Sequence, residues 1–113
     1  MNWTEAAKWS AAALQVRSDL PNAHATLGAA LSNLGQGDKA ITHYRAALNL
    51  NPGLVDARLN LGITLLLQKK FDEAILQLGE VLRVSPEHPA ALRFLEAARR
   101  KQAEGETSSP IRR

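Results

Sequence analysis

A segment of this 113-residue chain recurs 34 residues further along, and this period constrains the fold more than any other feature of the sequence. In the first copy, residues 21–54, the recurring positions hold Leu27, Gly28, Leu31, Ala40, Tyr44, Ala47 and Pro52. In the second copy, residues 55–88, the equivalent positions hold Leu61, Gly62, Leu65, Ala74, Leu78, Val81 and Pro86. A fixed period of this length indicates stacked structural repeats, each packed only against its neighbours.

Each copy has the pattern of two helices joined by a short turn. Apolar residues three or four apart define one face of a first helix, at Ala23, Leu27, Ala30, Leu31 and Leu34. Gln36-Gly37 interrupts this pattern, and a second helix follows with an apolar stripe at Ala40, Ile41, Tyr44, Ala47 and Leu48. Pro52 ends the second helix because proline has no N–H for the helical hydrogen bonds. We expect the small residues Gly28 and Ala40 to mark the closest approach of the two backbones.

The order Leu-Gly, large apolar residue, Ala, aromatic residue, Ala and Pro at this spacing resembles the tetratricopeptide repeat. The resemblance covers residues 21–88 as two full units and extends in part to about Gln102. The sequence departs from the family pattern at His24 and Arg58, where a tryptophan is common, and at Lys69, where a glycine is usual. The resemblance implies an all-α fold, a right-handed α-solenoid of antiparallel helical hairpins.

The period also predicts how the chain is divided. We expect one helical repeat domain in residues 1–104, made of a half repeat 1–20, the repeats 21–54 and 55–88, and a capping helix 89–104. In the capping helix Glu96 and Arg99 replace the Gly and Leu of the earlier units. Because burying unpaired charge is costly, we expect no further helix to pack there. Residues 105–113 are rich in turn formers and are predicted to be a disordered tail.

The chain opens with the second helix of a repeat whose first helix is absent. We therefore expect one face of this helix to lack a partner, the face made by Trp3, Ala6, Ala7, Ser10 and Ala13. In one interpretation the chain is a fragment, or the alanine-rich face is small enough to tolerate water. In the other, a second copy of the chain or a missing upstream helix covers this face, which then mediates self-association.

Composition and spacing argue against several classes of function. The chain has no cysteine, and His24, His43 and His88 lie at unrelated positions of different helices, so we expect neither a metal nor a cofactor. No Ser-His-Asp, Cys-His or glycine-rich phosphate-binding pattern occurs, and we expect no enzyme. The net charge of +3 owes much to basic residues near the C-terminus, with no aromatic residues between them to stack bases. Nucleic acid is therefore not an expected partner.

A membrane is not an expected partner either. The most apolar run, residues 59–67, is far shorter than the roughly 20 residues that span a bilayer. The N-terminus has no basic segment followed by an apolar one, the pattern of a secretory signal. We therefore expect a cytoplasmic protein.

The family resemblance implies that the first helices line a concave groove. In the second unit Leu59, Ile63 and Leu66 form one apolar stripe of this groove, and the Asn60 amide can hold a peptide backbone. The capping helix adds three further residues to the predicted peptide site, Arg93, Phe94 and Arg100. The alternative is that neighbouring helices or the tail cover the stripe. Some family members clamp acidic C-termini with a Lys and an Asn; Ala25 and Ala29 stand at those places, which disfavours such a ligand.

These observations favour a non-catalytic scaffold that binds a peptide segment of a partner protein in its concave groove. Self-assembly through the N-terminal face is the alternative, and a size that depends on concentration would distinguish it.

Overall fold

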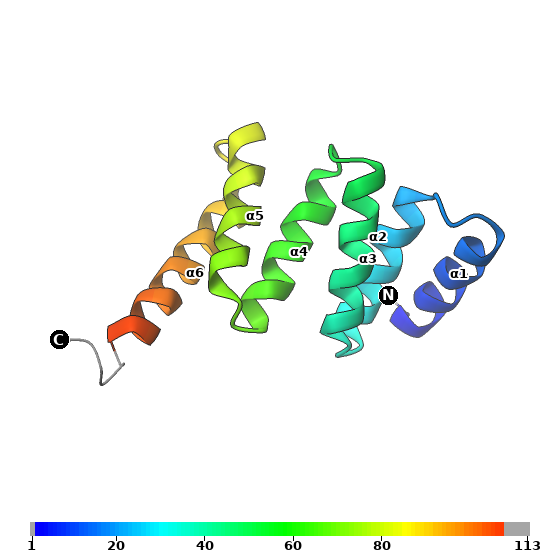
Figure 1. The fold of residues 1–113 in the computed structure, drawn as a ribbon, viewed down its shortest axis with the longest axis horizontal. Coiled ribbons are helices and arrows are strands. Elements are labelled where there is room, and N and C mark those ends of the chain that lie inside the picture. Colours follow the sequence, from blue (N-terminus) through cyan, green and yellow to red (C-terminus); the bar gives the residue numbers. More distant parts are fainter. Residues whose placement is uncertain (1, 108–113) are drawn as a thin grey trace.

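The computed structural model describes residues 2–107. It contains six helices, α1 (Trp3–Val16), α2 (Pro21–Asn33), α3 (Gly37–Leu50), α4 (Val55–Leu67), α5 (Phe71–Val84) and α6 (Pro89–Thr107), and no strand occurs in this range. The helices stack side by side in chain order as a right-handed α-solenoid, with α1 at one end and α6 at the other (Figure 1). The all-α fold predicted from the 34-residue period is confirmed.

Local sequence explains where the helices begin and turn. Pro21 and Pro89 open α2 and α6, where the missing N–H of proline would have no helical partner in any case. The turns from α2 to α3 and from α4 to α5 each contain one residue in the left-handed region, Gly35 with φ 81° and Lys69 with φ 63°. This region favours glycine, so Lys69 adopts a conformation that is costly for a residue with a side chain.

The helices of each hairpin approach closely at a glycine. A Cβ atom at Gly28 would lie 2.9 Å from the Tyr44 ring, and one at Gly62 would lie 2.8 Å from Leu78 Cγ. The Tyr44 ring therefore packs directly on Gly28, and Leu78 packs on Gly62 in the same way, while the closest approach of the two backbones at Gly28 and Ala40 stays a prediction. The large side chain that fills the space comes from the second helix in both cases.

The buried side chains form a continuous core along the stack. The largest fully buried residues are Tyr44, Leu61, Leu65, Leu78 and Val81. Burial raises the pKa of Tyr44 to about 12. Because each hairpin buries its apolar side against the next one, no single central core is needed.

A polar contact, which we call the Asp–Gln latch, recurs between successive hairpins. Gln68 at the end of α4 donates a hydrogen bond of 3.0 Å to Asp38 at the start of α3. Gln102 on α6 donates in the same way to Asp72 at the start of α5. Each latch ties the end of a first helix to the start of the preceding second helix. The equivalent positions nearer the N-terminus hold Leu34 and Thr4, whose side chains do not allow this contact.

The last helix is longer than the sequence predicts. α6 continues through Gly105 to Thr107, three residues past the expected end at residue 104, so the predicted start of a disordered tail at residue 105 is wrong. Two contacts hold this end, the latch from Gln102 and an ion pair of 3.8 Å between Lys101 and Glu104. The rest of the predicted tail, residues 108–113, lies outside the described residues.

Candidate functional site

The first helices α2, α4 and α6 present one side of the solenoid, which we call the first-helix surface. Neighbouring first helices touch, α2 with α4 and α4 with α6. Ser32 Oγ on α2 and Thr64 Oγ1 on α4 lie 3.2 Å apart, and this hydrogen bond links α2 directly to α4. Residues 34 apart therefore follow one another across the surface, and the predicted peptide-binding residues belong to such rows.

The apolar stripe predicted on α4 is only partly available to a ligand. Leu59, Ile63 and Leu66 are all half-buried, and Leu59 and Leu66 pack against the hydrophobic core. The stripe expected to line the groove therefore also serves the core at Leu59 and Leu66, and only the exposed part of each of these side chains is available to a ligand. Leu67, one residue beyond the predicted set, is 74% exposed and extends the apolar surface into solvent.

Asn60 lies among these apolar residues with an unused side-chain amide. It is half-buried, and its amide makes no hydrogen bond with any other residue in the described part of the chain. Besides the backbone bonds of the helix, its backbone oxygen accepts from Thr64 Oγ1 at 2.8 Å. An amide can donate and accept at once, so Asn60 offers both groups that a peptide backbone needs.

The α6 end of the first-helix surface is basic and aromatic. The Arg93 guanidinium lies 5.3 Å from the centre of the Phe94 ring, a cation–π contact that holds the two side chains together. Arg93 and Arg100 are exposed, and neither forms an ion pair within residues 2–107. Two unpaired guanidinium groups at one end of the surface give it a positive potential there.

The face predicted to lack a partner at the N-terminus is half covered. α2 is the only described helix in contact with α1, and it buries Ser10, which is 8% exposed. Trp3, Ala6, Ala7 and Ala13 are half-buried, whereas Ala40 and Ala47, the equivalents of Ala6 and Ala13 in α3, are fully buried. The expectation that this face is open is therefore wrong for Ser10. The apolar residues that α1 exposes most are two that the sequence analysis did not select, Trp9 and Val16.

His24 and His43 form a contact that the sequence analysis missed. Their Nδ1 atoms are 3.1 Å apart, and His24 Nε2 lies 2.9 Å from the carbonyl oxygen of Ser18. Because a carbonyl only accepts, His24 Nε2 donates to Ser18, and one of the two Nδ1 atoms donates to the other. Burial lowers the pKa of His43, and the neighbouring His24 lowers it further. The 34-residue period could have revealed this pair, because Arg58 and Gln77 stand at the equivalent positions and are also hydrogen-bonded to each other.

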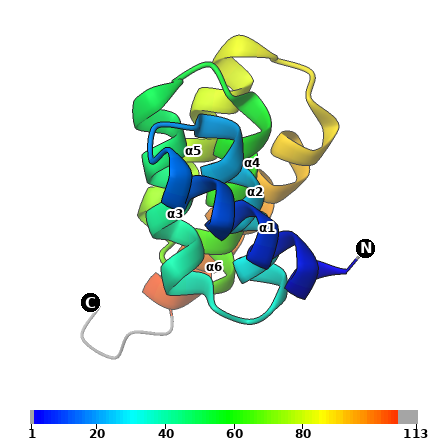
Figure 2. The same ribbon diagram turned by 90° about the vertical axis from the view of Figure 1, so that its right-hand side faces the viewer.

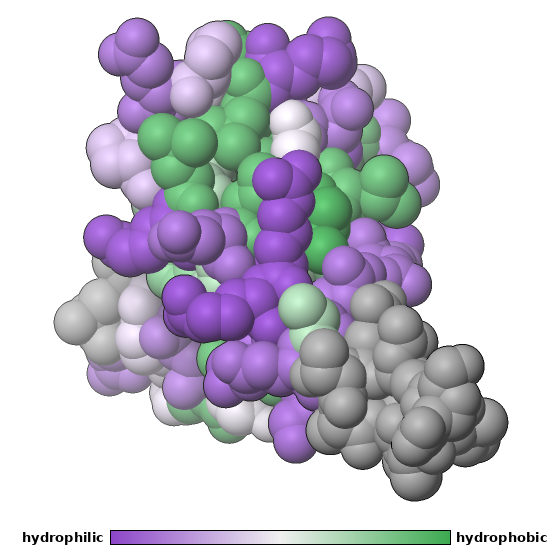
Figure 3. All heavy atoms as spheres, turned by 90° about the vertical axis from the view of Figure 1, so that its left-hand side faces the viewer, coloured by the Kyte–Doolittle hydropathy of each residue, from purple (hydrophilic) through white to green (hydrophobic). Residues whose placement is uncertain are grey.

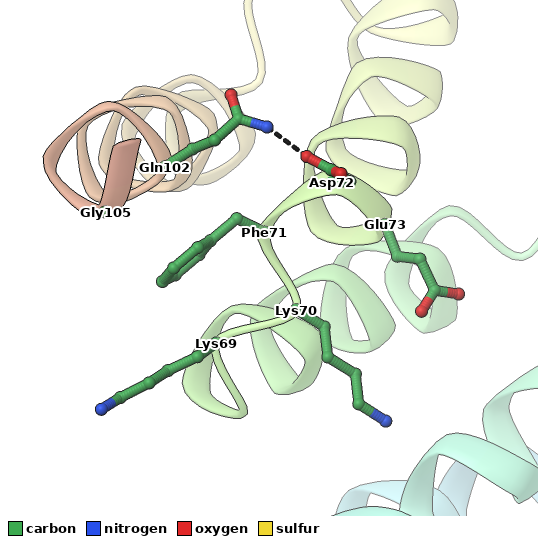
Figure 4. Close-up of a pocket in the computed structure, with 7 residues that line it drawn as sticks. All are labelled: Lys69, Lys70, Phe71, Asp72, Glu73, Gln102 and Gly105. Carbon is green, nitrogen blue, oxygen red and sulfur yellow. Dashed lines mark hydrogen bonds between the residues drawn. The ribbon is translucent and has the colours of Figure 1, made fainter. Parts of the chain in front are cut away.

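A hollow of about 560 Å³ lies where the turn from α4 to α5 meets the end of α6 (Figure 4). Its wall carries both signs of charge, with Lys69 and Lys70 on the turn and Asp72 and Glu73 on α5. The latch from Gln102 to Asp72 crosses between its two walls (Figure 4). The mixed charges select no particular ion. Nor does any cluster of three or more potential metal ligands occur in residues 2–107.

Sequence comparison identifies one family. Residues 34–98, more than half of the chain, match the family described as tetratricopeptide repeat. No curated protein matches the chain. Within the described range, no helix combines the length and apolar character needed to cross a bilayer.

Several solved structures share the fold. The first TPR domain of human RPAP3 matches with a TM-score of 0.87 at 20% identity, over 95% of this chain and 84% of that one. The first TPR of Spaghetti (RPAP3), bound to the HSP90 peptide SRMEEVD, matches with a TM-score of 0.86 at 20% identity, over 89% and 80% of the two chains. MamA from Desulfovibrio magneticus RS-1 matches with a TM-score of 0.84 at 26% identity, over 92% and 59%. This chain thus spans little more than half the length of the MamA structures, 55% of another one.

Proposed function

Since the chain belongs to the tetratricopeptide repeat family, we propose that it is a non-catalytic protein–protein interaction scaffold, and that it binds a peptide segment of a partner protein on the first-helix surface. The proposal takes residues 1–104 as the interaction domain and the cytoplasm as its compartment. It requires neither a metal nor a cofactor.

The observation that carries the proposal is the free amide of Asn60. The amide is still reached by solvent, since Gln68 Oε1 is the buried side-chain polar atom that lacks a partner in the described residues, so a ligand could use both Asn60 groups without breaking a contact inside the chain. A peptide backbone laid across α4 would supply both a donor and an acceptor. Ile63 and Leu67 flank the site and would contact apolar side chains of the same segment.

The charge of the surface supports one orientation of the ligand. Arg93 and Arg100 lie at the α6 end, so acidic residues of the segment would lie there. Apolar contact would contribute most of the affinity, because exposed ion pairs typically add only about 0–1 kcal/mol each. The arginines would mainly increase the association rate and fix the orientation.

The RPAP3 complex with the HSP90 peptide supports a peptide as the class of ligand. It does not make the acidic C-terminus of that peptide the ligand of this chain. Ala25 and Ala29 occupy the places at which some family members carry the Lys and Asn of a carboxylate clamp. We therefore propose an internal, mixed apolar and acidic segment rather than a free C-terminal carboxylate.

The test is a binding titration against a panel of short peptides that vary independently in apolar and acidic content, with SRMEEVD as the comparator. We expect the mixed peptides to bind wild type and to shift NMR signals of α4 and α6. Ile63→Asp should abolish binding without loss of helix content, because Ile63 is not part of the core cluster. Arg93→Ala should weaken binding modestly, and more at low salt than at high salt.

Leu76→Asp is the matched control, because Leu76 is 67% exposed on α5, outside the first-helix surface. This variant should bind as wild type does. Normal binding by Ile63→Asp, or signal shifts confined to α3 and α5, would show that the ligand site lies elsewhere.

A further inference from the structure

Two hollows between successive second helices are related by the 34-residue period. In the view along the stack, α3 and α5 lie on the opposite side from α2 and α4 (Figure 2). One hollow, of about 420 Å³, is lined by residues of α1, α2 and α3, namely Ala11, Leu14, Gln15, Leu27 and His43. The other hollow, of about 280 Å³, is lined by residues of α3, α4 and α5, and we call it the arginine notch. Its residues are Arg45, Leu48, Asn49, Arg58, Leu61 and Gln77.

The two hollows share a floor and differ in charge. Every lining residue of the first hollow has its equivalent in the notch, and the two leucines of the floor recur. Arg45 stands at the position of Ala11. Arg58 stands at the position of His24, the partner of His43. The repeat therefore keeps the shape of the hollow and adds two guanidinium groups to it.

Arg58 is a half-buried arginine whose partners are all neutral. It donates to Gln77 Oε1 at 2.8 Å and to the carbonyl oxygen of Pro52 at 3.3 Å, and it forms no ion pair within residues 2–107. A guanidinium has five N–H groups, so three of them have no acceptor in this part of the chain. Because charges removed from water are normally paired, Arg58 is oriented by the hairpin and still able to bind an anion.

Two glutamates lie near the notch, and each is paired with another arginine. Glu73 accepts from Arg45 at 2.8 Å, and Glu80 accepts from Arg83 at 2.9 Å. The hydrogen bond and charge of Arg83 lower the pKa of Glu80, and the charge of Arg58 adds a smaller effect. The positive charge of Arg58 is therefore not neutralised by a carboxylate of its own.

Side-chain amides add neutral donors to the notch. Gln77 uses its Oε1 to accept from Arg58, so its Nε2 group is directed to other partners and has none in the described residues. Asn49 is exposed, and its side chain makes no hydrogen bond in the same range. The donors come from three helices around one hollow. This arrangement suits the three oxygens of a phosphate better than a planar carboxylate, which a single guanidinium can match.

We propose that the arginine notch binds the phosphate group of a phosphorylated side chain. Arg58 and Gln77 donate to phosphate oxygens from one wall, and Arg45 and Asn49 donate from α3. The leucine floor contacts the carbon atoms next to the ester oxygen. That a protein carries the phosphate follows from the proposed scaffold function, whereas the phosphate site itself does not depend on it. No residue of the notch belongs to the predicted peptide site.

An NMR titration of the full 113-residue chain tests the inference at about pH 7.5, where phosphoserine carries about two negative charges. The probes are N-acetyl-O-phosphoserine amide, inorganic phosphate and N-acetylaspartate amide, each at the same ionic strength. We expect the phosphoserine probe to shift the side-chain N–H signals of Arg58, Gln77 and Asn49 until they saturate. Inorganic phosphate should bind at the same place and more weakly, because it makes no contact with the floor. The aspartate probe should bind about tenfold more weakly than the phosphoserine probe or worse.

Gln77→Glu blocks the notch from within. The new carboxylate would pair with Arg58, so the dissociation constant for the phosphoserine probe should rise about tenfold or more, with unchanged helix content. Arg58→Lys keeps the charge but loses the planar fork, and should also weaken binding. Gln77→Glu should leave peptide binding on the first-helix surface unchanged, so failure of this inference can be told from failure of the proposed function.

Arg99→Gln is the matched control, because it changes the net charge by the same amount as Gln77→Glu. Arg99 is exposed and lines a hollow with Glu96 at the α6 end, where an apolar area is bordered by hydrophilic side chains (Figure 3). This variant should bind the phosphoserine probe as wild type does. Equal weakening by Arg99→Gln and Gln77→Glu would indicate general attraction to a basic chain and would overturn the inference. Unshifted Arg58 and Gln77 signals, or equal affinity for the phosphoserine and aspartate probes, would overturn it too.

Discussion

His43 shows how a single residue makes stability depend on pH. Its pKa is lowered in the folded protein, first by burial and then by His24, so the folded state binds this proton less readily than the unfolded chain. Unfolded histidine titrates near pH 6.5. The free energy of unfolding should therefore fall as the pH drops below about 6.5, and level off once the pH passes below the folded pKa.

A paired substitution isolates this contribution. His24→Arg with His43→Gln transfers the Arg58–Gln77 contact of the second hairpin to the first, keeping a hydrogen bond but no titrating group. Urea unfolding at about pH 7.5 and about pH 5.5 should show a smaller loss of stability in the double variant than in wild type. An equal loss would mean that other groups cause the pH dependence.

At the same scale, the sequence predicted the packing of residues that belong to the repeated pattern better than the burial of residues that contact a neighbouring repeat. Gly28 was predictable because its small size is part of the repeated pattern. The partial burial of Leu59 and Leu66 was not, because it depends on their packing against core residues that come together only in the folded chain. Trp9 and Val16 were missed since the exposed side of α1 follows from its packing on α2 alone.

At the scale of the element, the turn from α4 to α5 holds a residue with a side chain in a backbone conformation that favours glycine. Lys69 has φ 63°, while its equivalent in the first hairpin is Gly35 with φ 81°. The left-handed conformation costs a residue with a side chain about 1–2 kcal/mol. Lys69→Gly should therefore raise the free energy of unfolding by roughly 0.5–1 kcal/mol, the remainder being offset by the greater freedom of glycine in the unfolded chain.

Gly35→Ala is the converse change and should lower stability by a similar amount, since no neighbouring atom prevents it and only the backbone conformation opposes it. Thermal unfolding of the two variants measures both effects. Shifts of the same sign would show that the turn conformation does not control stability here.

The ends of elements were less predictable than their existence. The breaks at Gln36-Gly37 and Pro52 placed α3 to within one residue at its start, where Gly37 already belongs to the helix, because both act locally. The end of α6 was misplaced since Gly105 taken alone suggests a stop, whereas Gln102 and Lys101 make contacts that support the last turns. The contact of Gln102 with Asp72 exists only once α5 and α6 are packed together, whereas Lys101 and Glu104 pair within α6 itself.

At the scale of the whole molecule, stability should vary along the solenoid. Among the described helices α1 has one packing partner, while α3 and α4 each have at least two. Amide hydrogens of α1 should therefore exchange faster than those of α3 and α4 in the dilute protein, where local opening is easiest at the least supported element. Hydrogen exchange followed by mass spectrometry measures this, and protection of α1 equal to that of α3 would contradict it.

The overall architecture was the most predictable level, because a 34-residue period requires every hairpin to pack in the same way. The period does not indicate which surface of the solenoid binds a ligand. That depends on positions at which the copies differ, such as Asn60 against Thr26, and on whether their side chains find partners in the folded chain.

The uneven distribution of the Asp–Gln latches has a mechanical consequence. Asp38 with Gln68 and Asp72 with Gln102 fasten the two later joints of the stack, whereas Thr4 and Leu34 leave the joint between α1 and the first hairpin unfastened. The later joints therefore combine helix packing with a directional hydrogen bond, whereas the α1 joint depends on the packing of α1 against α2 without a latch. A latch fixes how far two helices can slide past each other, so sliding along the helix axes is restrained by side-chain hydrogen bonds at the two later joints and not at the first.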